Sequence, residues 1–125
     1  MTWTAGAHGR VTTTYTAQYA DPISFARGET ITVTERAEPW RDNSAWMWVW
    51  CEDARGKSGW VPEGFFERRG EGAGAGVGLR DYSAVELSVA QGERVTVEEV
   101  VAGWLLCVTD DGRRGWVPLE CVEEA

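Results

Sequence analysis

Residues 48–67 read "WVWCEDARGKSGWVPEGFFE", and residues 104–123 read "WLLCVTDDGRRGWVPLECVE". When the second stretch is written under the first, a Trp, a Cys, a Gly, the run Gly-Trp-Val-Pro and the closing Glu coincide. Chance does not supply so many matches in the same order, and such internal similarity defines the architecture of a chain. The sequence therefore contains a duplication.

The similarity extends toward the N-terminus of both copies. Residues 15–36, "YTAQYADPISFARGETITVTER", align with residues 79–100, "LRDYSAVELSVAQGERVTVEEV". The spacing between the aligned blocks is eight residues longer in the first copy, which indicates an insertion there. We expect the following organisation: a flexible tail at 1–9, domain 1 at 10–69 with a long loop at 36–47, a linker at 70–78, and domain 2 at 79–125.

The stretch between the copies is rich in glycine. Residues 70–78 read "GEGAGAGVG", with glycine at every second position. A glycine-rich run of this length behaves as a flexible coil that spans about 15–18 Å. The alternative is that part of it pairs as an extended strand at the edge of a sheet.

Local patterns predict strands. The runs "TITVT" and "RVTVE" alternate apolar and polar residues with period two, as half-buried strands do. The glycines of "DARGKSG" and "DDGRRG" suit hairpin turns, and a proline ends each "WVP" segment because it cannot donate to a ladder. No stretch has a helical period. The fold class is therefore all-β, in two copies of about 50–60 residues that lie near the lower size limit for a stable core.

Composition excludes several functions. The net charge is −8, with 20 acidic and 12 basic residues, so the basic stripe of a nucleic-acid-binding protein is missing. No apolar run reaches the ~18 residues that a membrane helix needs, and the N-terminus does not have the pattern of a signal peptide. We therefore expect a cytoplasmic protein that binds neither nucleic acid nor membranes.

Catalytic and metal-binding patterns are also missing from the sequence. The sole histidine, His8, lies in the expected tail, away from any serine or cysteine with which it would form a nucleophilic pair. Three cysteines are too few and too scattered for a disulfide framework or a zinc site. The glycine run lacks the Lys-Ser/Thr ending of a phosphate-binding loop. We expect no enzyme activity, no cofactor and no metal.

Both copies resemble Src-homology-3 (SH3) domains. The segments "LRDYSA", "VELSVAQGE", "WLLCV" and "GRRGWVP" of the second copy match, in order, the ALYDY start, the ELSF and Gly-Asp/Glu elements, the tryptophan strand and the G-x-x-G-[LIW]-[IV]-P ending of that family. The first copy is similar to the variant SH3 domains of bacteria, with "DPISFARGE" in place of the ELSF element. The resemblance implies two five-stranded small barrels in tandem. It also implies a shallow aromatic groove that holds extended, proline-rich peptides in the polyproline II conformation.

The resemblance carries the groove onto domain 1. Trp48 matches the usual groove wall, Pro62 the family proline, and Phe65 the closing tyrosine. Tyr15 and Tyr19 bracket the ALYDY-like region, and Tyr19 is the favoured counterpart of Tyr82, with Gln18 as the ungapped alternative. We expect acidic residues of this copy to select basic peptides and the inserted tryptophans to add aromatic area. The candidate peptide-binding residues are Tyr15, Tyr19, Asp21, Trp46, Trp48, Pro62 and Phe65, supported by Glu38, Trp40 and Asp42.

Domain 2 keeps fewer of the groove residues and is expected to be auxiliary. Tyr82, Trp104 and Pro118 match, but Arg80 and Cys121 stand where the family has aromatic rings. Each missing ring removes about 1.5–3 kcal/mol of apolar burial.

Other functional readings stay open beside peptide binding. The strand pattern places Trp46, Trp48 and Trp50 on one face, opposite the core, where a ligand, another copy or another chain has to cover them. One alternative is therefore a structural or oligomerisation protein whose aromatic faces pack together. Another is a cell-wall-binding protein, if the chain is exported. The identity and orientation of the ligand, a joint groove of the two domains and the oligomeric state stay undetermined.

Overall fold

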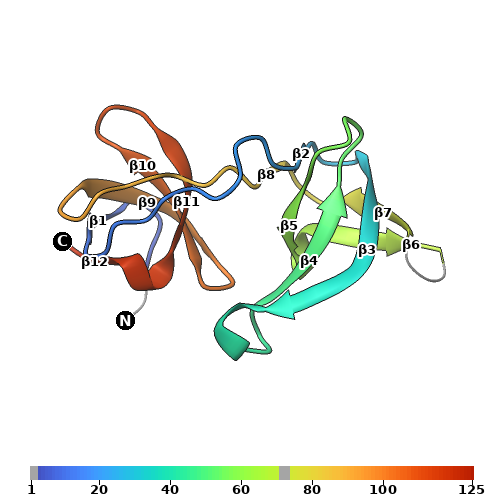
Figure 1. Ribbon diagram of the computed structural model, residues 1–125, viewed down its shortest axis with the longest axis horizontal. Coiled ribbons are helices and arrows are strands. Elements are labelled where there is room, and N and C mark those ends of the chain that lie inside the picture. Colours follow the sequence, from blue (N-terminus) through green and yellow to red (C-terminus); the bar gives the residue numbers. More distant parts are fainter. Residues whose placement is uncertain (1–2, 71–73) are drawn as a thin grey trace. The chain divides into compact units, whose positions relative to one another are not determined.

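The computed structural model describes residues 3–70 and 74–125. The chain divides into two compact units, of which unit 1 is Met1–Ala20 with Val85–Ala125 and unit 2 is Asp21–Ala84. Each unit contains one five-stranded antiparallel sheet, and no α-helix occurs among the described residues (Figure 1). The expected all-β class with two SH3-like units is confirmed.

The sheet of unit 1 has the strand order β11-β10-β9-β1-β12. Valines and a leucine on its inner face form a core in which Val97, Leu105 and Val117 have no exposed surface. The elements are β1 (Ala7–Val11), β9 (Arg94–Val101), β10 (Trp104–Thr109), β11 (Arg114–Pro118), the 3-10 turn η3 (Leu119–Cys121) and β12 (Val122–Glu124).

The sheet of unit 2 has the equivalent order β5-β4-β3-β7-β6, and a two-stranded sheet of β2 and β8 accompanies it. Both five-stranded sheets end in strands that do not pair with each other, so they are SH3-like sheets rather than closed barrels. The elements are β2 (Ser24–Phe25), β3 (Thr30–Pro39), η1 (Trp40–Asp42), β4 (Met47–Glu52), β5 (Ser58–Pro62), η2 (Glu63–Phe65), β6 (Phe66–Arg69), β7 (Gly74–Gly78) and β8 (Tyr82–Ser83).

The two copies of the repeat exchange their first strands. Strand β1, from the first copy, lies between β9 and β12 of the second copy. Strand β7, which precedes the second copy, lies between β3 and β6 of the first copy (Figure 1). Each unit therefore joins the beginning of one copy to the body of the other, and the compact units do not follow the expected boundaries at 10–69 and 79–125.

The expected flexible tail is part of a core in its described residues. His8 lies in β1, opposite Thr96 of β9, and the side chain of Trp3 is 9% exposed within the core of unit 1. A Cβ added to Gly9 would lie 3.2 Å from the Trp3 ring, so the tryptophan covers a strand position that has no side chain. The tail is held in place because it supplies both a strand and a large apolar group.

The expected linker is also a strand where it is described. Gly74–Gly78 forms β7, which is an inner strand rather than an edge strand, and residues 71–73 lie outside the described residues. A Cβ added to Gly76 would lie 2.6 Å from Val33, and one added to Gly78 would lie 2.6 Å from Phe25. Gly76 and Gly78 therefore serve close packing instead of flexibility.

The insertion of the first copy lengthens a hairpin more than it lengthens a loop. Strand β3 continues to Pro39 and β4 begins at Met47, so the expected loop at 36–47 is reduced to residues 40–46. The turn η1 closes this connection, and Arg41 and Asp42 adopt positive φ angles of 53° and 58°. The alternating pattern of β4 correctly predicted which of its side chains face the core, because Val49 and Cys51 have no exposed surface.

Candidate functional site

Three aromatic rings of unit 2 form a cluster. The rings of Phe65 and Tyr82 meet edge to face with centroids 5.4 Å apart, and the Tyr82 ring also lies 5.6 Å from that of Phe25. The hydroxyl of Tyr82 donates a hydrogen bond of 2.8 Å to the carbonyl oxygen of Trp60, so its polar end is satisfied. Phe25, Phe65 and Tyr82 are called the aromatic cluster below.

Trp48 and Pro62 lie next to this cluster along the chain and across the sheet. Trp48 of β4 is directly opposite Pro62 of β5, and η2 with Phe65 follows Pro62 at once. Strand β4 also contacts η2. Three of the residues expected in the groove of domain 1, Trp48, Pro62 and Phe65, are therefore brought together.

Arg80 covers the ring of Phe65. Its guanidinium carbon lies 4.2 Å from the ring centroid, and the guanidinium Nε donates to the carbonyl oxygen of Asp81 at 3.3 Å. A planar guanidinium is well suited to this stacking. The preceding residue, Leu79, donates its backbone N–H to the Phe65 carbonyl and is 47% exposed. Sequence reasoning assigned Arg80 and Tyr82 to the second copy, domain 2 at 79–125. Strand exchange places both in unit 2, which contains the body of the first copy.

Two further predicted site residues of unit 2 have other contacts. The backbone N–H of Trp46 donates to the carbonyl of Asn43, so this tryptophan belongs to the turn between β3 and β4. Asp21 lies within 3.3 Å of the Lys57 ammonium and 3.8 Å of Arg55. Both bases stand on the hairpin between β4 and β5. The charge of Asp21 is therefore partly neutralised within the protein.

A buried carboxylate holds that hairpin to β2. Asp53 is 5% exposed and accepts backbone hydrogen bonds from Ser24 at 3.1 Å, Arg55 at 2.9 Å and Lys57 at 3.1 Å. Burial raises the pKa of Asp53, but these hydrogen bonds and the Arg55 guanidinium outweigh it and bring the pKa to about 2. The carboxylate therefore stays ionised and fixes the start of β2, which carries Phe25.

Tyr15 has the corresponding place in unit 1. Its backbone pairs with Val89, as Tyr82 pairs with Phe25 in unit 2, and the alignment of the copies equates Val89 with Phe25. The expectation that Tyr19 is the counterpart of Tyr82 is therefore wrong. It failed because the connection that follows Tyr15 is three residues longer than the one that follows Tyr82.

The polar and aromatic contacts of Tyr15 lie within unit 1. Its ring meets Trp104 edge to face with centroids 5.7 Å apart, and its hydroxyl donates to Glu86 at 2.6 Å. Burial, followed by this hydrogen bond, raises the pKa of Tyr15 above its ordinary value. Tyr15 and the 39%-exposed Tyr19 thus belong to a different unit from Trp48, because their segment was exchanged.

The remaining groove positions of unit 1 lack a closing ring. Trp104 is paired with Pro118, as Trp48 is with Pro62. Cys121 stands in η3 where unit 2 has Phe65, and it accepts the backbone N–H of Thr12 as Phe65 accepts that of Leu79. The equivalent contacts make Thr13 the counterpart of Arg80. Unit 1 therefore has neither the stacked arginine nor the ring beneath it.

Comparison with protein families finds the same domain twice along the chain. The model of the variant SH3 domain matches residues 8–69 and again residues 72–125. The chain belongs to the variant SH3 family. A search of curated proteins and a search of solved structures each returned no match. The resemblance seen in the sequence is therefore confirmed. SH3 domains are generally protein-interaction modules, and the coarse functional class follows from that membership.

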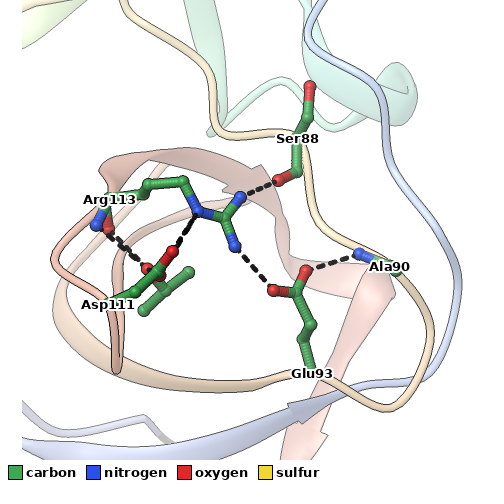
Figure 2. A network of polar contacts seen from close by, with 6 residues as sticks. Ser88, Ala90, Glu93, Asp111 and Arg113 are labelled. Atoms are coloured by element: carbon green, nitrogen blue, oxygen red, sulfur yellow. Dashed lines mark hydrogen bonds and ion pairs between the residues drawn. The ribbon is translucent and has the colours of Figure 1, made fainter.

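Unit 1 contains an exposed polar network that connects the hairpin between β10 and β11 to the segment before β9. Arg113 donates to the carbonyl of Ser88 at 3.0 Å, to Glu93 at 2.6 Å and to Asp111 at 3.1 Å (Figure 2). The other carboxylate oxygen of Glu93 accepts the backbone N–H of Ala90 at 2.7 Å. These groups all bond one another within the unit and are half-exposed or exposed, so the network supports the fold modestly and offers little to a ligand.

The tryptophans at the groove positions of both SH3 units are mostly covered. Trp48 is 7% exposed and Trp104 is 8% exposed, so the face that carries them is not an open display of rings. The half-buried Trp50 and Trp60 of unit 2 lie 5.2 Å apart, and the guanidinium of Arg36 lies 4.7 Å from the Trp60 ring. Exposed surface at the aromatic cluster comes chiefly from Leu79 and Arg80.

Neither a metal-binding cluster nor a membrane-spanning helix occurs in the part of the chain that the structure describes. Within residues 3–70 and 74–125, no group of His, Cys, Asp or Glu has an arrangement that would hold a metal ion. In the same ranges no helix is long and apolar enough to span a membrane. All three cysteines are buried thiols.

Proposed function

We propose that the protein binds an extended segment of a partner protein through unit 2, and that unit 1 has an auxiliary role. The observation that carries the proposal is the stacking of Arg80 on Phe65, whose ring also meets Tyr82 edge to face. The pairing of Trp48 with Pro62 beside it supports the same site. Flat rings and a planar cation provide the surface on which proline rings of an extended peptide pack.

The ligand class follows from this surface and from the charge of the chain. An extended peptide already in the polyproline II conformation loses little entropy on binding, so even a small apolar surface holds it. The net charge of −8 attracts basic ligands at long range, and this attraction outweighs the single positive charge of Arg80 at the site itself. We therefore propose a proline-containing, basic peptide whose affinity falls as salt concentration rises.

Panning of a random peptide-display library against the intact protein tests the proposal. Enriched peptides are then titrated by fluorescence anisotropy against the wild type and Phe65→Cys, which installs the residue that unit 1 has at Cys121. Phe65 is 9% exposed and its ring supports the Arg80 guanidinium, so loss of the ring removes that support and binding should weaken by about two- to fivefold. Arg80→Thr, which copies Thr13, removes the exposed cation itself and should weaken binding at least as much.

A matched variant in the other unit provides the control. Cys121→Ala changes the equivalent position of unit 1 and should leave the affinity of the enriched peptides unchanged. Circular dichroism and thermal melts establish that each variant is folded. If no peptide is enriched, or if Phe65→Cys binds as the wild type does, the aromatic cluster is not the binding site.

The low exposure of Trp48 and Trp104 favours a second candidate, a structural role in which these rings serve packing. Labelling with 5-fluorotryptophan separates the two functions, because the ¹⁹F signal of an accessible indole shifts between H₂O and D₂O. Trp48→Phe and Trp104→Phe assign the two signals. The structural role is supported if the two ¹⁹F signals show no isotope shift and do not move when any enriched peptide is added.

A further inference from the structure

Val11 and Gly78 occupy the same position in their two sheets. The backbone N–H of Val11 donates to Glu93, and its carbonyl accepts from Gly92, at 2.9 and 2.8 Å. Gly78 makes the same two bonds with residues 28–29 at 2.9 and 2.8 Å. The exchanged strands β1 and β7 are therefore equivalent parts, and their side chains at this position can be compared directly.

The surroundings of Gly78 leave no room for a side chain. Its neighbour across the register is Phe66, which is buried. A Cβ on Gly78 would lie 2.6 Å from Cδ1 and 2.8 Å from Cε1 of Phe25, and 3.0 Å from the carbonyl oxygen of Ala26. The Phe25 ring is itself fixed against Tyr82, so it cannot turn away without losing that contact.

The surroundings of Val11 require a side chain. Its neighbour across the register is Val122, and Val89 belongs to the same buried core. Val11 is 1% exposed, so a glycine in its place would leave a cavity in the centre of unit 1. The alignment of the repeats equates Val122 with Phe66 and Val89 with Phe25. One unit therefore combines a glycine with two phenylalanines, and the other combines three valines.

If each first strand paired with its own copy (pairing in chain order), neither unit would keep its matched set of side chains. Strand β1 would bring Val11 against Phe25, where a Cβ already clashes, and β7 would bring Gly78 against Val89, where a cavity would open. Overpacking and cavities each destabilise a core. We propose that side-chain size at Val11 and Gly78 selects which copy's first strand completes each sheet, and that the two copies interlock for this reason.

A second feature of the chain acts in the same direction and has to be separated from size. Six residues connect Tyr82 to Val89, whereas nine connect Tyr15 to Phe25. Short connections favour strand exchange because they strain the direct return of the chain. Size selection and connection length make different predictions when side chains are exchanged and the connections are left unchanged.

Two matched disulfides report which pairing is present. Arg10 lies opposite Glu123 in the structure, and pairing in chain order would place it opposite Glu67, the counterpart of Glu123. Arg10→Cys/Glu123→Cys should therefore form an intramolecular disulfide in the wild-type background, and Arg10→Cys/Glu67→Cys should not. The native thiols do not compete, because burial raises the pKa of Cys51 and Cys107 to about 12 and Cys121 is also buried.

Exchanging the two side chains should reverse the choice. In the variant Val11→Gly/Gly78→Val, the chain-order pairing has a glycine beside Phe25 and a valine beside Val89. The disulfide at 10–67 should then form in at least about half of the monomers, measured as intact mass after air oxidation, and the one at 10–123 should decline. Retention of the 10–123 disulfide alone would overturn the proposal and assign the exchange to connection length.

A second measurement keeps the proposal testable if the exchanged variant does not fold. Gly78→Val alone should lower Tm by about 5 °C or more, because overpacking costs about 1–3 kcal/mol. Adding Phe25→Val, which copies Val89, should restore more than half of that loss. Additive losses in the double variant would contradict size selection. None of these readouts involves a peptide, so they stand or fall independently of the proposed function.

Discussion

The rings of Phe65 and Tyr82 meet edge to face at an interplanar angle of 84°, although the two residues belong to different copies of the repeat. Phe65 closes the first copy, and Tyr82 begins the second. The aromatic cluster of unit 2 is thus assembled from both copies, which makes an isolated copy of the repeat an incomplete unit.

Tyr82→Ala should destabilise unit 2 strongly. The substitution removes a ring that contacts Phe25 and Phe65 and is 7% exposed, so a loss of about 3–5 kcal/mol in the free energy of unfolding is expected. Tyr82→Phe removes only the hydrogen bond to the Trp60 carbonyl and should cost about 1 kcal/mol. Urea denaturation measures both values, and equal losses would show that the ring contacts contribute nothing.

The strands of each copy were predictable because their signals are local. Alternation in "TITVT" and "RVTVE" and the two "WVP" segments indicated strands that the structure has as β3, β9, β5 and β11. The pattern of residues 47–51 also identified the buried side of β4, since Val49 and Cys51 face the core. Periodicity and turn chemistry decide these features within a few residues of chain.

The exchange of first strands was not predictable from such patterns. Residues 7–11 and 74–78 have few large side chains, and the second segment has the composition of a flexible linker. Their place is decided by the fit of Val11 and Gly78 to residues far away in the sequence. Tyr15 and Tyr82 were assigned to the wrong units for the same reason, because they follow those segments into the opposite units.

Asp53→Asn should destabilise the protein in a pH-dependent manner. The folded pKa of about 2 lies below the ordinary value of 3.8, so the carboxylate stabilises the fold above about pH 4 and this contribution is lost as pH falls toward 2. The difference between wild type and Asp53→Asn in the free energy of unfolding should therefore be largest at pH 5–7 and shrink below pH 4. Urea melts at several pH values measure it.

The other unit suggests the control for Asp53. At the equivalent position, Thr109 accepts the backbone N–H of Arg113 at 3.0 Å with a hydroxyl that does not titrate. Asp53→Thr should keep part of the hairpin anchoring but remove the pH dependence between 2 and 4 that the carboxylate supplies. A pH dependence unchanged from wild type in both variants would mean that other carboxylates account for it.

Tyr15 should resist ionisation in the folded protein. Burial and the hydrogen bond to Glu86 raise the pKa of Tyr15, so its contribution to stability is complete below about pH 10 and is lost as pH rises further. Absorbance titrations at 295 nm of wild type and Tyr15→Phe should coincide up to about pH 11 while the protein is folded. An extra ionisation near pH 10 in the wild type would contradict this placement of the phenol.

Arg36 should couple energetically to the tryptophans on the outer face of unit 2. Its guanidinium lies 5.2 Å from the centroid of Trp50 and 4.7 Å from that of Trp60, which is within the range of cation–π attraction. In a double-mutant cycle of Arg36→Ala with Trp50→Leu, the residue that unit 1 has at Leu106, a coupling of about 0.5–1 kcal/mol is expected. Glu38→Gln serves as the control, because it removes the exposed ion pair with Arg36 but leaves the rings in place. Coupling that disappears in the Glu38→Gln background would attribute the effect to the ion pair instead of the indoles.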